Sequence, residues 1–280
     1  MKQLKPLAIT LLLSSPLSFA VDSQDFVKDN VFTQGVEGPT MYNGALYAVN
    51  YAQQGTIGRV DNMGKTSLFV RLPDDSVGNG LQFDSQGNLF IADYVNHNIL
   101  KVPAGSNKAE VFAHNSKMNQ PNDIAITKSG ALFASDPNWA NETGQLWRIN
   151  ADGSTHLLEK NMGTTNGVAV NNDNTKLYVN ESVQRVVWQY DLDENLNISN
   201  KKAFIKFTDH GLDGMRVNNK GHVFITRYGA GKVLEVSPNG KLLNSYQLKG
   251  QHPTNLAFNE TQNKVYVTMQ KRGAIEVIEL

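Results

Sequence analysis

Six polar residues recur along the chain at steps of 41 to 47 residues, each just before a short apolar stretch: Glu37, Asn79, Asn122, Asn166, Asp213 and Thr254. The first five carry a carboxylate or an amide oxygen. Hard oxygen ligands of this mixed kind are those that Ca²⁺ prefers, with Mg²⁺ and Mn²⁺ as looser fits, whereas Zn²⁺ sites favour His and Cys. The residue types therefore indicate a divalent-cation site, if the fold brings these positions together.

A simpler alternative is that these residues only cap turns, where Asn and Asp satisfy backbone groups. That explanation suits any single position. It does not account for Glu37, because the segment 37–39 ("EGP") needs no turn chemistry and Glu is depleted in strands. Two carboxylates, Glu37 and Asp213, would repel each other in a confined channel without a cation, and one pKa would rise. A cation site is the interpretation that covers the whole set.

The polar residues belong to a longer repeat. Each is followed by a small residue, an apolar strand, a turn rich in Asn, Asp or Gly, and a second strand rich in Leu, Phe, Tyr and Val. Segments 78–94 (GNGLQFDSQGNLFIADY) and 121–137 (PNDIAITKSGALFASDP) show the pattern. Two further strands follow in each unit, as in 98–104 and 109–115. A period in the low forties with four strands per unit is typical of β-propeller blades.

The sequence therefore predicts an all-β protein, a single six-bladed β-propeller with four antiparallel strands per blade. The last unit ends at its third strand, and segment 25–32 (DFVKDNVF) supplies a strand without a partner. We expect this N-terminal strand to pair into the last blade and close the ring, which removes the open sheet edges that invite aggregation. Six blades account for residues 21–280 as one domain.

Residues 1–20 have the pattern of a secretory signal peptide. The basic start MKQLK precedes an apolar run, and Ser18 and Ala20 are small residues at −3 and −1 of a cleavage point. A membrane anchor is the alternative, but the run is shorter than the roughly 20 residues that a bilayer span needs. We expect a periplasmic or secreted protein with no membrane association after cleavage.

Composition excludes several other classes. Lys plus Arg and Asp plus Glu both number 26, so the net charge is zero, and the basic excess of a nucleic-acid-binding protein is missing. The chain has no Cys, which excludes a disulfide scaffold, a thiolate metal site and a cysteine nucleophile. We expect a monomer that acts on a small molecule.

The loops between the second and third strands of each repeat should lie over the same mouth as the polar residues, because the second strand returns to that face. They offer aromatic and cationic side chains, which suit a small polar ligand with oxygen functions. We predict substrate contacts from Asn79, Asn122, Tyr94, Trp139 and Arg227. The alternatives are that Trp139 only packs against its own blade and that Arg227 is an ordinary exposed strand-end residue.

The series of motifs, in this order and spacing, resembles the SMP-30/gluconolactonase/LRE-like family, whose members are six-bladed propellers with a divalent cation in the axial channel. The motifs are EGP at 37–39, NG at 79–80, PND at 121–123, NG at 166–167 and DGM at 213–215. The resemblance implies that Glu37, Asn166 and Asp213 are metal ligands. It also implies that Asn122 ligates the metal or contacts substrate, and that Asp213 is the candidate general base.

Two features depart from the sugar-lactone-hydrolysing members of that family. Gln120 stands where those members carry Arg, two residues before the amide of Asn122. The acidic substrate contact of those members has no evident counterpart in segment 137–144 (PNWANETG). These departures bear on specificity for gluconolactone and leave the metal centre unaffected.

These features predict an enzyme, a metal-dependent hydrolase of lactones or related esters with Asp213 and Asn122 as catalytic residues. The expected cofactor is Ca²⁺, with Mg²⁺, Mn²⁺ or Zn²⁺ as alternatives. It would polarise the carbonyl and position a water or lower its pKa. A carboxylate that ligates a cation is a weak base, so activation of the water by the ion alone is the alternative to proton transfer onto Asp213.

Two other functions stay open at this point. One is a non-catalytic propeller that binds a ligand or partner around a structural calcium, since 91–102 (IADYVNHNILKV) also resembles NHL-type propellers, many of which only bind. The other is an organophosphate hydrolase or a lyase on the same scaffold, because one fold supports several chemistries.

Overall fold

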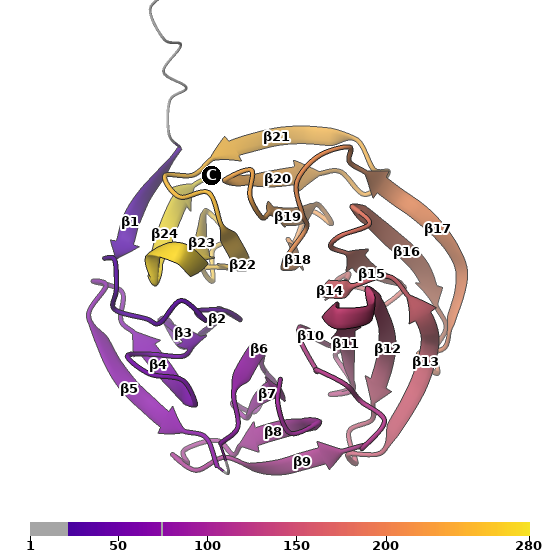
Figure 1. Cartoon of the computed structure of the whole chain (residues 1–280), viewed down its shortest axis with the longest axis horizontal. Coiled ribbons are helices and arrows are strands. Elements are labelled where there is room, and N and C mark those ends of the chain that lie inside the picture. The colour runs from indigo at the N-terminus through magenta and orange to yellow at the C-terminus, as the bar shows by residue number, and fades with distance from the viewer. Residues whose placement is uncertain (1–21, 74) are drawn as a thin grey trace, which may run out of the picture.

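Six four-stranded antiparallel sheets stand around a central axis like the blades of a propeller (Figure 1). The computed structural model describes residues 22–73 and 75–280, so the predicted signal peptide at 1–20 lies outside the described residues. The prediction of an all-β, six-bladed propeller is confirmed. Within the described ranges, the helical elements are two short 3-10 turns, η1 (Trp139–Asn141) and η2 (Gln270–Arg272), and none could span a bilayer.

Each blade is a meander whose first strand lies nearest the axis and whose last strand lies at the outer rim (Figure 1). The strands are, for blade 1, β2 (Thr40–Tyr42), β3 (Ala45–Val49), β4 (Thr56–Val60) and β5 (Thr66–Arg71); for blade 2, β6 (Gly78–Phe83), β7 (Leu89–Asp93), β8 (Asn98–Val102) and β9 (Glu110–His114); for blade 3, β10 (Ile124–Ile126), β11 (Leu132–Asn138), β12 (Thr143–Ile149) and β13 (Thr155–Met162); for blade 4, β14 (Thr165–Val170), β15 (Lys176–Glu181), β16 (Val186–Leu192) and β17 (Ile198–Lys206); for blade 5, β18 (Met215–Val217), β19 (Val223–Arg227), β20 (Lys232–Val236) and β21 (Leu242–Gln247); for blade 6, β22 (Pro253–Phe258), β23 (Lys264–Met269), β24 (Ala274–Glu279) and β1 (Ser23–Val27).

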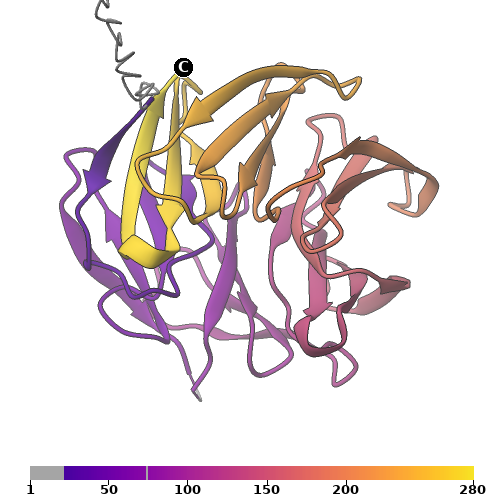
Figure 2. The same ribbon diagram turned by 45° about the horizontal axis from the view of Figure 1, so that its top comes forward.

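Blade 6 is completed by the N-terminal strand, as predicted. Strand β1 pairs antiparallel with β24, with Ser23 opposite Ile278 and Val27 opposite Ile275 (Figures 1 and 2). The strand is shorter than the expected segment 25–32, because the backbone turns at Asn30, which has a positive φ of 63°. Both ends of the propeller sequence therefore meet in one sheet, and blade 6 has the four strands of the other blades.

The hydrophobic core lies between adjacent blades. A blade packs both of its faces onto neighbours, so its second strand reads as a continuous apolar run, and all five residues of β3 and of β7 are buried. Leu81 and Ile91 are fully buried in the cluster that joins blades 1 and 2. Burying one such side chain stabilises the fold by about 1.5–3 kcal/mol. The rim strands are exposed along most of their length, as in β17.

Close contact between the inner strands explains why a small residue follows most of the polar positions. A Cβ atom on Gly80 would lie 2.8 Å from the Cα of Asp123 in the next blade, and one on Gly214 would lie 2.0 Å from the side chain of Asn255. Backbone hydrogen bonds cross the same gaps, for example from the Gly80 N–H to the carbonyl of Asn122 at 2.7 Å. The inner ends of the blades are therefore tied into one rigid ring.

Candidate functional site

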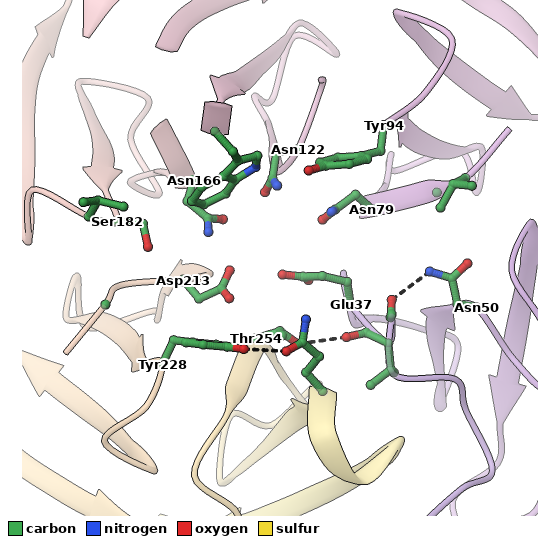
Figure 3. Close-up of a pocket in the computed structure, with 18 of the residues that line it drawn as sticks. Glu37, Asn50, Asn79, Tyr94, Asn122, Asn166, Ser182, Asp213, Tyr228 and Thr254 are labelled. Atoms are coloured by element: carbon green, nitrogen blue, oxygen red, sulfur yellow. Dashed lines mark hydrogen bonds between the residues drawn. The ribbon is translucent and has the colours of Figure 1, made fainter. Parts of the chain in front are cut away.

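The six recurring polar residues meet at one end of the axial channel. Glu37, Asn79, Asn122, Asn166, Asp213 and Thr254 all line a single cavity of about 690 Å³. Figure 3 shows the side chains of the first five pointing toward a common centre, with the carboxylates of Glu37 and Asp213 facing each other. The structure thus brings together residues that are up to 217 positions apart (254 minus 37) in the sequence.

Backbone hydrogen bonds hold these residues in place and leave their side chains free to face the cavity. The Asn122 N–H donates to the carbonyl of Ser135 at 2.9 Å, and the Asp213 N–H donates to that of Thr226 at 3.2 Å. The carbonyl of Glu37 accepts from the Val49 N–H at 3.1 Å. In these three blades the second strand therefore anchors the residue that precedes the first strand, so this part of the cavity floor is preorganised.

The two carboxylates on the floor are destabilised in their charged forms. Burial, with a further contribution from the negative charge of Asp123, raises the pKa of Glu37 to about 7. Burial, followed by the charge of Glu37, raises the pKa of Asp213 well above its usual range. Two carboxylates that face each other in a buried site do not ionise together unless a cation neutralises them. At neutral pH the floor is therefore poised to bind positive charge.

Three amide oxygens on the same floor lack partners. Among the described residues, the buried Oδ1 atoms of Asn79, Asn122 and Asn166 accept no hydrogen bond from any protein group. A buried acceptor left unsatisfied costs about 1–3 kcal/mol, and buried polar groups in native proteins are almost always paired. These three oxygens therefore indicate that the cavity binds a hydrogen-bond donor or a cation.

The donor set fits a hard divalent cation. Three amide oxygens and two carboxylates supply five oxygen ligands, and Ca²⁺ takes six to eight oxygens, some of them from water. Across residues 22–73 and 75–280, no three His, Cys, Asp or Glu side chains form a group that could hold a metal, so the classes of site built from those residues alone, such as Zn²⁺ sites rich in His and Cys, are not present there. The floor's chemistry is that of an oxygen-ligand site with a strong amide component.

A buried ion pair lies beneath this floor, and reasoning from the sequence did not identify it. Asp123 is fully buried, and its carboxylate accepts from the Arg216 guanidinium at 2.9 and 3.3 Å and from the Val168 N–H at 3.2 Å. It thereby links blades 3, 4 and 5. The repeat itself carried a signal that could have identified Asp123. Four other blades have a glycine at the equivalent position, as at Gly80, and Asp123 departs from that pattern.

The loops after each second strand form the wall of the cavity, as expected. Tyr94 and Trp139 line it, and the side chains of Trp139 and Gln120 lie close enough to the Tyr94 hydroxyl to lower its pKa, against the larger effect of burial. Burial is the main cause that raises the pKa of Tyr94, so its hydroxyl stays protonated. Gln120 supports this aromatic pair and does not itself line the cavity.

Arg227, a predicted substrate contact, is not brought to the cavity. Its guanidinium donates to the carbonyl and the carboxylate of Asp209 at 2.6 and 2.8 Å and lies 3.9 Å from the ring centre of Phe207. The side chain is therefore held behind the wall of the cavity, with Asp209 at the polar edge of its guanidinium and Phe207 against its flat face. The basic groups that do line the cavity are Arg185 and His210.

A second buried carboxylate positions the segment that carries Asn122. Asp136, at the end of the second strand of blade 3, accepts from the backbone N–H groups of Asn119 at 2.8 Å and Gln120 at 2.6 Å, and from Trp147 Nε1 at 3.0 Å. Burial is the largest influence on Asp136 and raises its pKa despite these bonds. Asp136 is a positioning residue that sequence reasoning also missed.

A closed six-bladed ring whose axial cavity ends in facing carboxylates and unpaired amide oxygens defines a propeller with a candidate cation site on its axis. The family model for the SMP-30/gluconolactonase/LRE-like region matches residues 36–271. Because this match covers most of the sequence, the chain belongs to the SMP-30/gluconolactonase/LRE-like family.

Individual relatives are distant. The gluconolactonase of Zymomonas mobilis subsp. mobilis is 28% identical over 217 residues, which cover 68% of this chain and 60% of that protein. A pentonolactonase of Haloferax volcanii is 28% identical over 151 residues, or 52% of each protein. The matched region thus spans between 52% and 60% of the length of these two relatives.

Solved structures agree on the fold over nearly the whole chain. A gluconolactonase from Xanthomonas campestris superposes with a TM-score of 0.80 at 18% identity, covering 91% of this chain and 88% of that one. Regucalcin from Agrobacterium tumefaciens, described as a calcium-binding protein, superposes with a TM-score of 0.79 at 20% identity, covering 92% and 93%. At these identities the superpositions show a common fold and no more.

Proposed function

We propose that this protein is a metal-dependent hydrolase of lactones or related carboxylic esters, with its catalytic site on the floor of the axial cavity. The observation that carries the proposal is the set of three buried, unpaired amide oxygens that face two carboxylates. Membership of a family whose matched relatives include a gluconolactonase and a pentonolactonase supports lactones as the substrate class.

Glu37, Asn122, Asn166 and Asp213 would hold the divalent cation, with Ca²⁺ favoured by the oxygen donor set. When bound, such an ion supplies Lewis acidity toward the ester carbonyl and lowers the pKa of nearby water. Asn79 and Asn122 would orient the carbonyl group. Asp213 is the carboxylate that would accept the proton of the attacking water.

The reaction adds one water across the acyl carbon–oxygen bond. The water oxygen bonds to the carbonyl carbon, the ring carbon–oxygen bond breaks, and the leaving oxygen takes a proton to become a hydroxyl. The product is a hydroxy acid, which releases a proton at neutral pH. The floor carboxylates and amides need only bind and orient the substrate and transfer a proton from the attacking water to the leaving oxygen. No further reactant is required.

The test combines metal analysis with a substrate panel on the purified protein. We expect one equivalent of divalent cation per chain, turnover of lactones in Ca²⁺, and loss of turnover in EDTA that is restored by added Ca²⁺. Glu37→Gln and Asp213→Asn should each lower kcat/KM at least a hundredfold. Glu194→Gln and Asp193→Asn, on an exposed turn, are the matched controls and should leave kcat/KM unchanged.

Other outcomes point to the remaining functions. A large Ca²⁺-dependent rise in melting temperature without turnover of any ester would favour a binding propeller with a structural ion. Turnover of an organophosphate but of no lactone would favour phosphoester chemistry on the same scaffold. Export to the periplasm or the medium stays a prediction, and it is checked by sequencing the N-terminus of the mature protein.

A further inference from the structure

The wall above the floor of the cavity is mainly aromatic and aliphatic. Val77 and Tyr94 come from blade 2 and Trp139 from blade 3, and Tyr228 comes from blade 5. Figure 3 shows Tyr94 and Tyr228 on opposite sides of the floor, as expected for blades that are three apart in a ring of six. A substrate that reaches the floor therefore passes between two aromatic side chains.

The Tyr228 hydroxyl is already used, because it donates to Gln270 Oε1 at 2.5 Å. The Tyr94 hydroxyl lies beside the side chains of Trp139 and Gln120, and burial raises its pKa. The rings of Tyr94, Trp139 and Tyr228 offer the cavity mainly apolar carbon surface. Such surface binds apolar groups favourably, by about 25 cal/mol for each Å² removed from water.

Two further polar wall residues are committed to the backbone. Asn50 donates to the carbonyl of Gly35 at 2.7 Å (Figure 3). It also accepts from the Gly55 N–H at 3.3 Å. The Thr254 hydroxyl donates to the carbonyl of Val36 at 2.9 Å. A ligand that used these groups would have to break the bonds that hold the Asn50 loop of blade 1 or the bond that joins blade 6 to the entry of blade 1, so they shape the cavity and do not bind hydroxyl groups.

The polar wall groups with capacity left come from four consecutive blades, 4, 5, 6 and 1. They are Ser182 and Arg185 of blade 4, His210 at the entry to blade 5, Gln270 of blade 6 and Gln54 of blade 1. A ligand can therefore be hydrogen-bonded along these blades, while blades 2 and 3 present Val77, Tyr94 and Trp139 to it. The wall thus has a polar sector and an apolar sector that spans two adjacent blades.

We infer that the substrate is a lactone with an apolar body, such as an alkyl- or aryl-substituted γ- or δ-lactone, and not a polyhydroxylated sugar lactone. This inference rests on the proposed hydrolase function. A sugar lactone carries hydroxyl groups around its ring, and those facing the apolar sector would be buried unpaired at a cost of about 1–3 kcal/mol each. The cavity of about 690 Å³ also lies within the range of pockets that hold drug-sized ligands.

The test compares two lactones of the same ring size on the Ca²⁺-loaded protein. The probes are δ-decalactone and D-glucono-1,5-lactone, with the uncatalysed rate subtracted from each. We expect kcat/KM to be at least tenfold higher for the alkyl lactone. A higher kcat/KM for the sugar lactone would overturn the inference while the hydrolase function stands, whereas turnover of no lactone or ester in the whole substrate panel would overturn the hydrolase function itself.

An isosteric pair of variants tests the apolar sector directly. Val77→Thr places a hydroxyl on that sector without changing its volume, and we expect KM for δ-decalactone to rise about three- to tenfold with kcat retained. Val95→Thr, in the loop after β7 of the same blade, outside the cavity lining and 47% exposed, is the control. An unchanged KM in Val77→Thr would overturn the assignment of the alkyl group to this sector.

Discussion

Asp123 of blade 3 and Arg216 of blade 5 form a buried ion pair, with guanidinium nitrogens 2.9 and 3.3 Å from the two carboxylate oxygens. A buried ion pair is weak support for stability by itself, because the desolvation of both charges opposes their attraction. Here the pair completes a charge balance. Glu37, Asp123 and Asp213 carry three negative charges, and Arg216 with one divalent cation supplies three positive charges.

The two single charge changes in this pair should therefore shift cation affinity in opposite directions, and the double change should cancel them. Asp123→Asn leaves Arg216 uncompensated, and we expect Ca²⁺ binding to weaken at least tenfold. Arg216→Gln leaves an extra negative charge, and we expect binding to tighten. The double variant restores the balance and should bind within about threefold of the native protein, as measured by titration calorimetry at pH 8.

The sign of the change in Arg216→Gln separates electrostatics from structure. If the ion pair only supported the fold, both single variants would weaken Ca²⁺ binding and the double variant would be no better than either. That pattern would contradict the charge balance. The melting temperature of each variant in EDTA reports any separate loss of stability.

The stability of the metal-free protein should fall as the pH rises from about 5 to about 7. Burial raises the pKa of Glu37 to about 7 and also raises that of Asp213, so in this window the folded state binds more protons than the unfolded state. The free energy of unfolding then decreases with pH, by up to about 1.4 kcal/mol per pH unit for each extra proton. Thermal melts in EDTA at several pH values measure this slope.

Added Ca²⁺ should raise the melting temperature increasingly over the same pH window, since it neutralises the ionised carboxylates. Carboxylates with lowered pKa values, such as Asp25 and Glu235, lose their stabilising effect only below their unfolded values of about 4 and do not mask the slope. Glu37→Gln should make the melting temperature in EDTA depend less on pH. A metal-free melting temperature that is constant or rises from pH 5 to pH 7 would refute the assignment.

The ion pairs of Arg272 help to hold the N-terminal strand β1 in blade 6 and so to close the ring. Its guanidinium pairs with Asp25 and Asp29 near β1 and with Glu276 of β24 at 2.6 Å, and the Glu276 side chain is fully buried. Arg272→Met leaves that carboxylate without its charged partner, and such a loss costs about 3–5 kcal/mol. Urea unfolding measures the change, and amide exchange in β1 should accelerate.

A matched ion pair in the same blade provides the control for the Arg272→Met variant. Lys264 pairs with Glu279 at 2.8 Å, but the two side chains are 39% and 61% exposed. We expect Lys264→Met to shift the urea midpoint very little, because exposed pairs contribute little to stability. Equal losses in Arg272→Met and Lys264→Met would show that the buried carboxylate is not the cause.

Glycines between the inner strands should not tolerate a side chain. A Cβ on Gly214 would overlap Asn255, at 2.0 Å, so Gly214→Ala must push blades 5 and 6 apart. We expect a loss of about 1–3 kcal/mol from overpacking and weaker Ca²⁺ binding, since Asp213 is displaced. Gly105→Asn, at a left-handed turn with open space around it, should leave both quantities unchanged in melts and calorimetry.

The repeat in the sequence was sufficient to predict the architecture and the convergence of the polar residues. A regular spacing of about forty residues with four strands per unit places equivalent positions on equivalent radii of a ring. For that reason Glu37, Asn122, Asn166 and Asp213 could be expected on one floor. The unpaired N-terminal strand likewise had one evident place, at the free edge of the incomplete last blade.

The tertiary structure alone decided which polar atoms remain free. Arg227 is as polar as Arg185 in the sequence, yet Asp209 and Phe207 hold it behind the wall while Arg185 lines the cavity. Asp123 and Arg216 are 93 residues apart, and no local pattern pairs them. A sequence determines which groups can donate or accept, but the use of each group depends on neighbours that packing brings within about 3 Å, and those come from other blades.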